Sequence, residues 1–300
     1  MPEPLLRQQL DIEKYLQDHA EGLSAFSFAN IFAWQDFFQF DSHVIEGCLC
    51  IFARNEIGTF LYLPPLGKNI APGVIEACFD RMEKANAGSG VTRVENVSCR
   101  QLAWFPEEKF SRYNKGYEYC YYRPDIAALR GNAYKSKRSS YHQFINNYDH
   151  QYLPYEEGMI DECLDLYRAW AQERAQAHPD DIYGHMLEEN QKVHERVLRH
   201  FKRLGLTGRV VKVGHKIKAY SFGFPVNPEM FCVFFEIADL KVKGLGVYIF
   251  SEFCRDATLE TYKFINAMDD LGMEHVQQTK MSFHPVCLLP AYVITKRNKP

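Results

Sequence analysis

The stretch Phe231-Cys-Val-Phe-Phe-Glu-Ile-Ala-Asp-Leu-Lys-Val-Lys-Gly-Leu-Gly246, followed by Val247-Tyr-Ile-Phe-Ser-Glu-Phe-Cys254, decides the fold of this chain. A run of mostly apolar residues of strand length leads into a short polar segment with glycines at positions 244 and 246. A second apolar run, long enough for a helix, follows directly. This order predicts a buried strand, a tight turn and a helix.

The turn has the features of an anion site made from backbone. The first N–H groups of a helix lack partners within the helix, and the helix dipole adds partial positive charge there. Glycine lets the chain turn tightly and lets a phosphate approach closely. A plain turn is the commoner reason for such a glycine pair, so Gly244 and Gly246 leave both interpretations open.

Composition limits the class of protein. The chain has 300 residues, of which 46% are hydrophobic, and a formal net charge of −3. Such a chain forms one large domain or two of roughly 150 residues, and it is not generally disordered. The small negative charge argues against a surface that coats nucleic acid everywhere, but it leaves room for a local basic groove.

Cysteine usage and hydropathy predict the compartment. Nine cysteines, an odd number without a C-x-x-C pair, favour reduced thiols. The first twenty residues lack the apolar core of a secretory signal, and no apolar run approaches roughly 18 residues. We therefore expect a cytoplasmic protein without a transmembrane segment.

Strand-like and helix-like segments alternate along the chain, which is typical of a layered α/β or α+β domain. In the first half we expect helices at 5–19, 74–87 and 126–148, and strands at 44–53, 59–63, 91–97 and 116–122. In the second half we expect helices at 159–175, 182–204 and from the glycine turn to about 267, and strands at 208–213, 216–224, 230–237 and near 276 and 293. The two halves have a similar layout, so the sequence predicts two domains, 1–149 and 150–300.

Three blocks of the sequence resemble one known family. They are Ser27-Phe-Ala-Asn-Ile-Phe-Ala-Trp34, Tyr134-Lys-Ser-Lys-Arg138, and the segment from Asn266 through Asp270-Leu-Gly to Thr279-Lys-Met-Ser-Phe-His-Pro285. Together and in order, they resemble the phosphatidylglycerol lysyltransferase C-terminal-domain family. The spacing Lys241-x-x-Gly244-x-Gly246 also resembles the pyrophosphate loop of GCN5-related acyltransferases, with Lys241 in place of the usual Arg or Gln.

The resemblance implies an α+β fold of two tandem GCN5-related acyltransferase-like (GNAT) domains, each a mixed, mostly antiparallel sheet flanked by helices. It implies an activity akin to that of Fem-type enzymes, which move an aminoacyl group from a charged tRNA to an amine or hydroxyl. The family resemblance favours aminoacyl-tRNA as the donor, whereas the loop favours acyl-coenzyme A. The acceptor stays open among a small molecule, a peptide and a lipid headgroup.

Transfer to an amine needs a group that takes up its proton and a positive group near the developing oxyanion. We expect Glu236 or Asp239, at the end of the strand before the glycine turn, or Asp270 to act as the base; Glu236 and Asp239 could instead be acids of the turn alone. We expect Lys280, on a strand facing the cleft, to meet a carbonyl oxygen or phosphate. Asp269 and His284 are candidates for substrate binding. The alternatives are a helix-capping carboxylate, a surface lysine and a structural histidine.

Phosphates of the donor are expected at Lys241, Gly244 and Gly246, with Lys135 and Arg138 as a second positive cluster. Residues 192–218 hold nine Lys or Arg and a single acid, whereas residues 156–189 are rich in acids. This asymmetry could steer a phosphate-rich donor, or it could belong to solvated helix faces. No metal-ligand spacing is present. A second hypothesis remains, a degenerate GNAT-like protein that binds a ligand or partner without chemistry.

Overall fold

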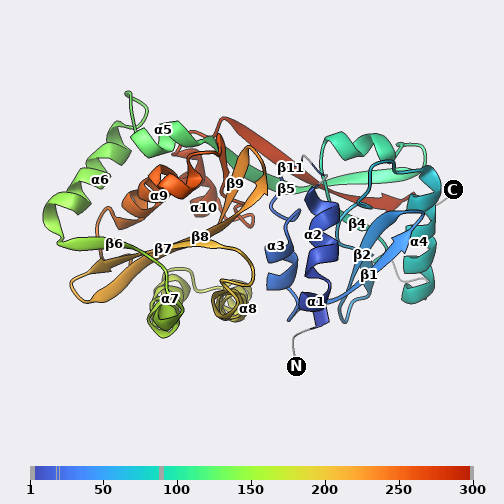
Figure 1. Ribbon diagram of the computed structural model, residues 1–300, viewed down its shortest axis with the longest axis horizontal. Helices are drawn as coiled ribbons and strands as arrows, with labels where there is room; N and C mark the ends of the chain where they lie inside the picture. The colour runs from blue at the N-terminus through green and yellow to red at the C-terminus, as the bar shows by residue number, and fades with distance from the viewer. Residues whose placement is uncertain (1–3, 18, 20, 88–90, 298–300) are drawn as a thin grey trace. The chain divides into compact units, whose positions relative to one another are not determined.

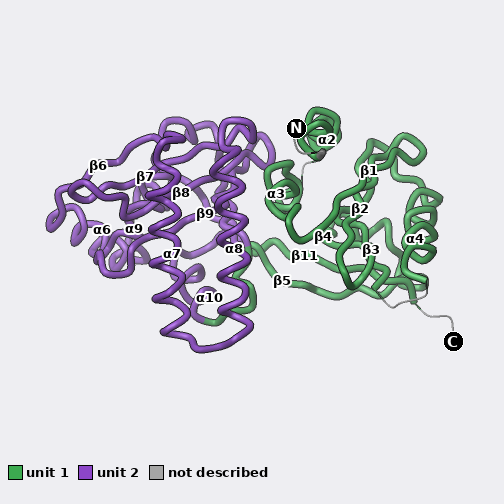
Figure 2. The backbone as a smooth tube through the Cα atoms, turned by 90° about the horizontal axis from the view of Figure 1, so that it is seen from below, with its two compact units in different colours: residues 1–118, 269–274, 288–300 green, residues 119–268, 275–287 purple. Residues whose placement is uncertain are grey.

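The computed structural model describes residues 4–17, 19, 21–87 and 91–297 of the chain. Contacts divide the chain into two compact units, which Figure 2 distinguishes by colour. Unit 1 comprises residues 1–118, 269–274 and 288–300, and unit 2 comprises residues 119–268 and 275–287. Both units therefore draw on separate segments of the chain, whereas the sequence predicts contiguous halves that meet at residue 150.

Unit 1 is a mixed sheet with short helices. Strands β1, β2 and β3 pair antiparallel, β3 and β4 pair parallel, and β4 pairs antiparallel with β11. The helices are α1 (Pro4–Arg7), α2 (Gln9–Gln17), α3 (Phe28–Ala33), α4 (Pro72–Asn86) and the 3-10 turn η1 (Arg100–Trp104). The strands are β1 (Gln39–Ile45), β2 (Cys48–Arg54), β3 (Thr59–Leu61), β4 (Val94–Val97), the first part of β5 (Phe110–Tyr122) and most of β11 (Cys287–Lys296).

Unit 2 holds a sheet in the order β5-β10-β9-β8-β7-β6, in which β9 and β10 run parallel and the other pairs antiparallel. Its strands are the end of β5, β6 (His150–Pro154), β7 (Thr207–Val213), β8 (Lys216–Asn227), β9 (Met230–Ala238) and β10 (Phe264–Asn266). Its helices are α5 (Arg123–Ala128), α6 (Lys135–Asn147), η2 (Glu157–Met159), α7 (Ile160–Ala177), α8 (Asp181–Arg199), α9 (Leu245–Arg255), η3 (Ala257–Leu259) and all but the first residue of α10 (Glu274–Met281).

Helices cover both faces of the unit 2 sheet (Figure 1). Helices α7 and α8 lie on one face, where the buried His194 stacks on Phe235 with ring centroids 3.8 Å apart. Helices α5, α6 and α9 lie on the other face, and the apolar stripe of α9 packs there through Leu245 and Ile249. A strand covered on both faces reads as a continuous apolar run, which is why β9 stands out in the sequence.

A bulge interrupts β9 next to its pairing with β10. Phe222 of β8 lies opposite Phe235, but the next residue, Gly223, lies opposite Val233, so Phe234 is the extra residue on β9. A Cβ on Gly223 would lie 2.1 Å from the carbonyl oxygen of Cys232, so only glycine fits at this point of β8. The bulge changes the direction in which the side chains that follow on β9 point.

Two predictions of secondary structure near the C-terminus are wrong. The helix after the glycine turn ends at Arg255 rather than near residue 267, because η3 and β10 follow it. The strand expected near Val276 is helix α10. Thr279 and Val276 are β-branched, and such residues favour strands by propensity. In the helix, the Thr279 hydroxyl donates to the carbonyl oxygen of His275, one turn earlier, at 2.9 Å. The expected strand near Val293 is confirmed as β11.

Candidate active site

Glu236 lies where two parallel strands part. Strand β10 pairs with residues 230–232 of β9, and Glu236 lies four residues beyond the last paired residue of β9. Beyond the bulge, Glu236 pairs in register with Ser221 of β8, so the two side chains share one face of the sheet. Tyr121 of β5 and Cys254 of α9 lie within electrostatic range of its carboxylate.

Burial changes the acidity of the Glu236 carboxyl group. Burial raises the pKa of Glu236 to about 8, although the positive charge of Lys280 and the Ser221 hydroxyl act to lower it. The Oε2 atom of Glu236 and the Oγ atom of Ser221 are buried, and neither makes a hydrogen bond of standard geometry with the described residues. Buried polar atoms are normally satisfied, so an unsatisfied pair beside a cation marks a place for a ligand or a reacting group.

Lys280 comes to this site from helix α10, not from a strand as the sequence predicts. Its ammonium donates to the carbonyl oxygens of Ala267, at 2.5 Å, and Met268, at 3.3 Å, just beyond the end of β10. The ammonium also lies 5.5 Å from the centroid of the Tyr119 ring. Carbonyl dipoles and an aromatic face hold the cation within electrostatic range of Glu236.

The other residues proposed for catalysis and substrate binding have separate places. Asp269 and Asp270 belong to unit 1, whereas Glu236 and Lys280 belong to unit 2. The Oδ1 atom of Asp270 accepts the N–H of Gly272 at 2.9 Å, which stabilises the loop before α10. His284 is exposed, with a φ of 56°, and its Nε2 lies 3.1 Å from the carbonyl oxygen of Ala133.

The glycine turn forms as predicted, between β9 and α9. Gly244 has a φ of +82° and precedes α9, and a Cβ there would lie 2.1 Å from the carbonyl oxygen of Ser140 on α6. Glycine at this position therefore allows α6 to pack closely against the start of α9. Gly246 is different, because no described atom outside its own turn of helix lies within 4 Å of a Cβ placed there.

The turn already holds a negative group of its own. The carboxylate of Asp239 accepts the N–H of Lys241 at 2.9 Å and pairs with the Lys218 ammonium at 2.6 Å. Burial acts to raise the pKa of Asp239, but these two hydrogen bonds outweigh burial and lower it. The side chain of Lys241 pairs with Glu173 at 2.5 Å. An acid thus occupies one backbone N–H of the turn, that of Lys241, and places negative charge there.

The basic residues of α6 have mixed roles. A guanidinium N–H of Arg138 donates to the carbonyl oxygen of Gly131 at 2.8 Å and another contact joins it to Leu129. Lys137 donates to the Ser282 hydroxyl at 2.5 Å, and burial lowers its pKa. Lys135 is exposed to solvent.

Two members of the basic run at residues 192–218 pair with acids of the preceding segment. Lys202 pairs with Glu157 at 2.9 Å and Lys212 with Glu162 at 3.8 Å. The acid-rich and basic segments therefore pair with each other on the folded unit, which reduces the local field that the sequence suggests.

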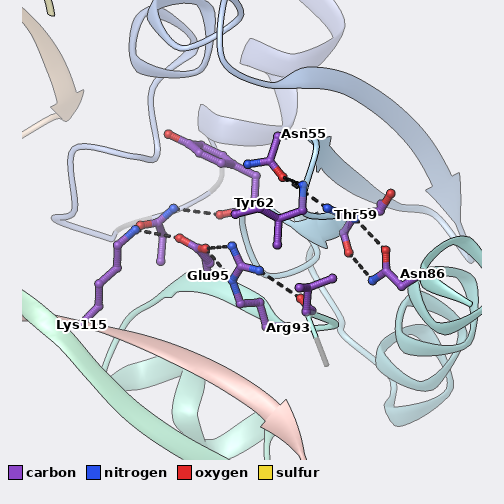
Figure 3. Close-up of polar contacts among 11 residues, drawn as sticks. Asn55, Thr59, Tyr62, Asn86, Arg93, Glu95 and Lys115 are labelled. Carbon is purple, nitrogen blue, oxygen red and sulfur yellow. Dashed lines mark hydrogen bonds and ion pairs between the residues drawn. The ribbon is translucent and has the colours of Figure 1, made fainter. Parts of the chain in front are cut away.

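Unit 1 has its own pair of parallel strands, β3 and β4, but a closed polar network lies beside them (Figure 3). Glu95 is held by the Lys115 ammonium and the Arg93 guanidinium, each at 2.7 Å. Burial acts to raise the pKa of Glu95, but these cations lower it overall. The side-chain amide of Asn96 donates to the carbonyl oxygen of Tyr62 at 2.9 Å. This satisfied acid contrasts with Glu236, so the candidate active site lies in unit 2.

The sequence singles out Glu236 and Lys280 as candidates, but it does not point to Ser221 or Tyr121, which the structure places near Glu236. Ser221 is a single hydroxyl inside an apolar strand, fully buried, and that isolation is the signal that could have revealed it. Tyr121 carries no comparable signal, because tyrosines surround it in the sequence. Within the described residues, no group of three or more His, Cys, Asp or Glu is arranged to hold a metal ion. Nor does that part of the chain contain a helix with the length and apolarity to cross a membrane.

Solved structures similar to this chain were found, although no curated protein matches. A conserved protein of unknown function from Bacteroides thetaiotaomicron is 27% identical, with 97% of each chain covered and a TM-score of 0.87. L-PGS from Bacillus licheniformis is 13% identical, with 100% of this chain and 93% of that chain covered and a TM-score of 0.68. FemX is 6% identical, with coverages of 94% and 95% and a TM-score of 0.63.

These likenesses confirm the predicted fold, two tandem GNAT-like domains with mixed, mostly antiparallel sheets, because a tandem GNAT protein is also among the similar structures. The predicted family is confirmed as well. Residues 17–295 match the family described as phosphatidylglycerol lysyltransferase, C-terminal, and this chain therefore belongs to that family.

Proposed function

We propose that this protein is an aminoacyl transferase that moves an aminoacyl group from a phosphate-rich ester donor to an amine or hydroxyl acceptor. The observation that carries the proposal is the buried Glu236 carboxyl, unsatisfied at Oε2 and within electrostatic range of Lys280, at the point where β9 and β10 part. The family is named for a lysyl transfer to a lipid, and FemX is similar in fold, which supports the same class of reaction here.

The two groups have complementary roles in direct transfer. The acceptor nitrogen or oxygen attacks the ester carbonyl, and the Glu236 carboxylate takes up the proton that the acceptor loses. The Lys280 ammonium stabilises the negative charge that develops on the carbonyl oxygen. The bond to the donor oxygen then breaks, and Glu236 returns the proton to that oxygen. A base with a pKa near 8 suits this exchange, because it is partly ionised near neutral pH.

We further propose that the donor is an aminoacyl-tRNA rather than acyl-coenzyme A. In the turn after β9, the Asp239 carboxylate accepts the N–H of Lys241, and the Lys241 side chain pairs with Glu173, which disfavours a coenzyme A pyrophosphate there. By contrast, residues 126–148 contain no acid. The exposed residues of α6 include Lys135, Ser136, Ser139, Gln143 and Asn146, and these residue types commonly contact nucleic-acid phosphates.

The donor is tested by titrating the protein with lysyl-RNA minihelices, with the same RNA uncharged, and with acetyl-coenzyme A. We expect saturable binding of RNA that weakens as salt is raised, and a further loss in K135E. G246A, which changes the turn without a steric clash, should leave RNA binding unchanged. Saturable binding of acetyl-coenzyme A that K241E abolishes would overturn the choice of donor.

Chemistry is tested separately with E236Q and K280M. We expect each to lower single-turnover loss of the aminoacyl group to an added amine at least roughly 100-fold, while RNA binding stays within about twofold of the parent protein. A parent protein that binds RNA but transfers nothing to any amine or hydroxyl would instead support the second hypothesis, a ligand-binding protein without chemistry. Unchanged transfer in both variants would remove Glu236 and Lys280 from the site.

A further inference from the structure

The chain makes a tight turn directly after β10. Asn266, the last residue of that strand, is fully buried, and its Oδ1 atom accepts the N–H of Met268 at 2.6 Å. Met268 has a φ of 58°, a left-handed conformation that residues with a Cβ rarely adopt. The side chain of Asn266 therefore supports a backbone conformation that Met268 alone would disfavour.

This turn directs two backbone carbonyls at one cation. The carbonyl oxygens of Ala267 and Met268 both accept hydrogen bonds from the Lys280 ammonium. The backbone N–H of Tyr119 on β5 donates to the carbonyl oxygen of Met268 at 3.1 Å. The carbonyl oxygen of Tyr119 accepts the N–H of Ala267 at 2.9 Å. Lys280 lies on the eight-residue helix α10, so these carbonyls are what fixes its ammonium at the end of the strand.

We propose that Asn266 is a positioning residue for this site: its amide holds Met268 in the left-handed conformation, so that the carbonyls of Ala267 and Met268 fix the Lys280 ammonium near Glu236. A catalytic role for this positioning rests on the proposed function. The positioning of Lys280 by Asn266 does not depend on that function, and it can be measured without an assay of transfer.

The pKa of Glu236 reports the position of Lys280, because it depends on the charges around the carboxyl. Besides Lys280 from α10, the described groups that interact electrostatically with its carboxyl include Ser221 from β8, Tyr121 from β5 and Cys254 from α9. Among these, Lys280 is the cation, and its charge lowers the pKa of Glu236. When the turn loosens and Lys280 moves away, the pKa of Glu236 should rise further, because burial then acts with less opposition.

The experiment is a pH titration of the Glu236 side-chain carboxyl by carbon-13 NMR, with E236Q used to assign the signal. We expect N266A to raise the pKa of Glu236 by at least about half a unit, in the same direction as K280M. The double variant N266A/M268G should return the pKa to the parent value, because glycine adopts a positive φ without help from a neighbouring side chain.

N227A is the matched control. Asn227 also accepts a backbone N–H two residues on, that of Glu229 at 3.0 Å, but in the turn between β8 and β9. Its loss should leave the titration of Glu236 unchanged. If N266A does not fold, N266Q replaces it, since it keeps a buried amide but moves the oxygen by one methylene.

An unchanged pKa of Glu236 in the folded Asn266 variant, or a raised one that M268G does not restore, would overturn the proposal. Failure of the proposed function is a different result. In that case E236Q would retain full transfer while N266A still shifted the titration of Glu236.

Discussion

At the scale of single residues, the buried carboxyl of Glu236 lowers the stability of the folded protein when it ionises. Its carboxyl is buried in a sheet covered by helices, and its Oε2 makes no hydrogen bond of standard geometry with the described residues. Such a group costs folding free energy when it ionises. Active sites commonly retain groups of this kind because chemistry needs them.

The first prediction is that E236Q stabilises the protein in a pH-dependent way. The pKa of Glu236 is about 8 in the folded protein against an ordinary value of 4.5. The folded state thus binds the proton more tightly, so this residue favours folding below about pH 4.5, and that contribution is lost as pH rises towards 8. Glutamine does not titrate. The melting temperature of E236Q should therefore exceed that of the parent increasingly between pH 5 and pH 8.

The gain in unfolding free energy should approach about 1.4 kcal/mol per pH unit within that window and then level off. Thermal melts of both proteins at several pH values give the comparison. A constant difference between the two proteins across the window would mean that Glu236 titrates normally.

The second prediction concerns the thiols. All nine cysteines are free, with Cys99 and Cys287 exposed and the other seven buried. A thiol reagent should therefore modify two cysteines quickly in the folded protein and all nine after unfolding. Prior treatment with a reductant should not change the total. Fewer than nine reactive thiols after unfolding without reductant would reveal a disulfide.

At the scale of elements, the two glycines before and within α9 separate packing from ligand binding. Gly244 combines a positive φ with close approach of the Ser140 carbonyl, whereas a Cβ added to Gly246 would have open space around it. The resemblance to a pyrophosphate loop cannot distinguish these roles, because both glycines fit the same spacing.

The third prediction is that G244A destabilises the protein and G246A does not. Alanine at 244 meets both a disfavoured φ and a steric clash, so we expect a loss of at least about 2 kcal/mol in unfolding free energy. Alanine at 246 should change it by less than about 1 kcal/mol, since alanine favours the helix over glycine. Urea denaturation measures both. Equal losses in the two variants would contradict this assignment of Gly244 to helix packing.

At the scale of the whole molecule, each unit is completed by a strand from the other half of the sequence. The end of β5 belongs to unit 2 and pairs with β10, whereas β11, from residue 288 on, belongs to unit 1 and pairs with β4. A sheet that loses such a strand exposes unpaired backbone along a new edge.

The fourth prediction follows from this exchange. Separately expressed fragments 1–149 and 150–300 should each lack a dispersed NMR spectrum, because the first lacks β11 and the second lacks β5. Mixing them should restore the spectrum. Full-length protein cleaved between residues 149 and 150 is the control, and it should remain folded. Cooperative unfolding of either fragment alone would show that the halves are independent domains.

The amount that sequence could predict differs between these scales. Strands β7, β8 and β9 and helices α7 and α9 were predictable because a local period or an apolar run specifies each of them. Helix α10 was not, since it is short and polar and its residues have no strong preference, so contacts from elsewhere decide its state.

The sequence by itself determined the family, the tandem fold and the glycine turn, because each depends on neighbouring residues or on recognisable blocks, and it singled out Glu236 as a candidate. The tertiary structure decided that Glu236 is buried opposite Ser221 and near Lys280, that Asp239 occupies the turn, and that Asn266 supports the carbonyls around Lys280. Tyr121, whose hydroxyl donates to the carbonyl oxygen of Lys280, lies 159 positions from it in the sequence. Burial and electrostatics depend on such distant neighbours, and a sequence pattern records only near ones.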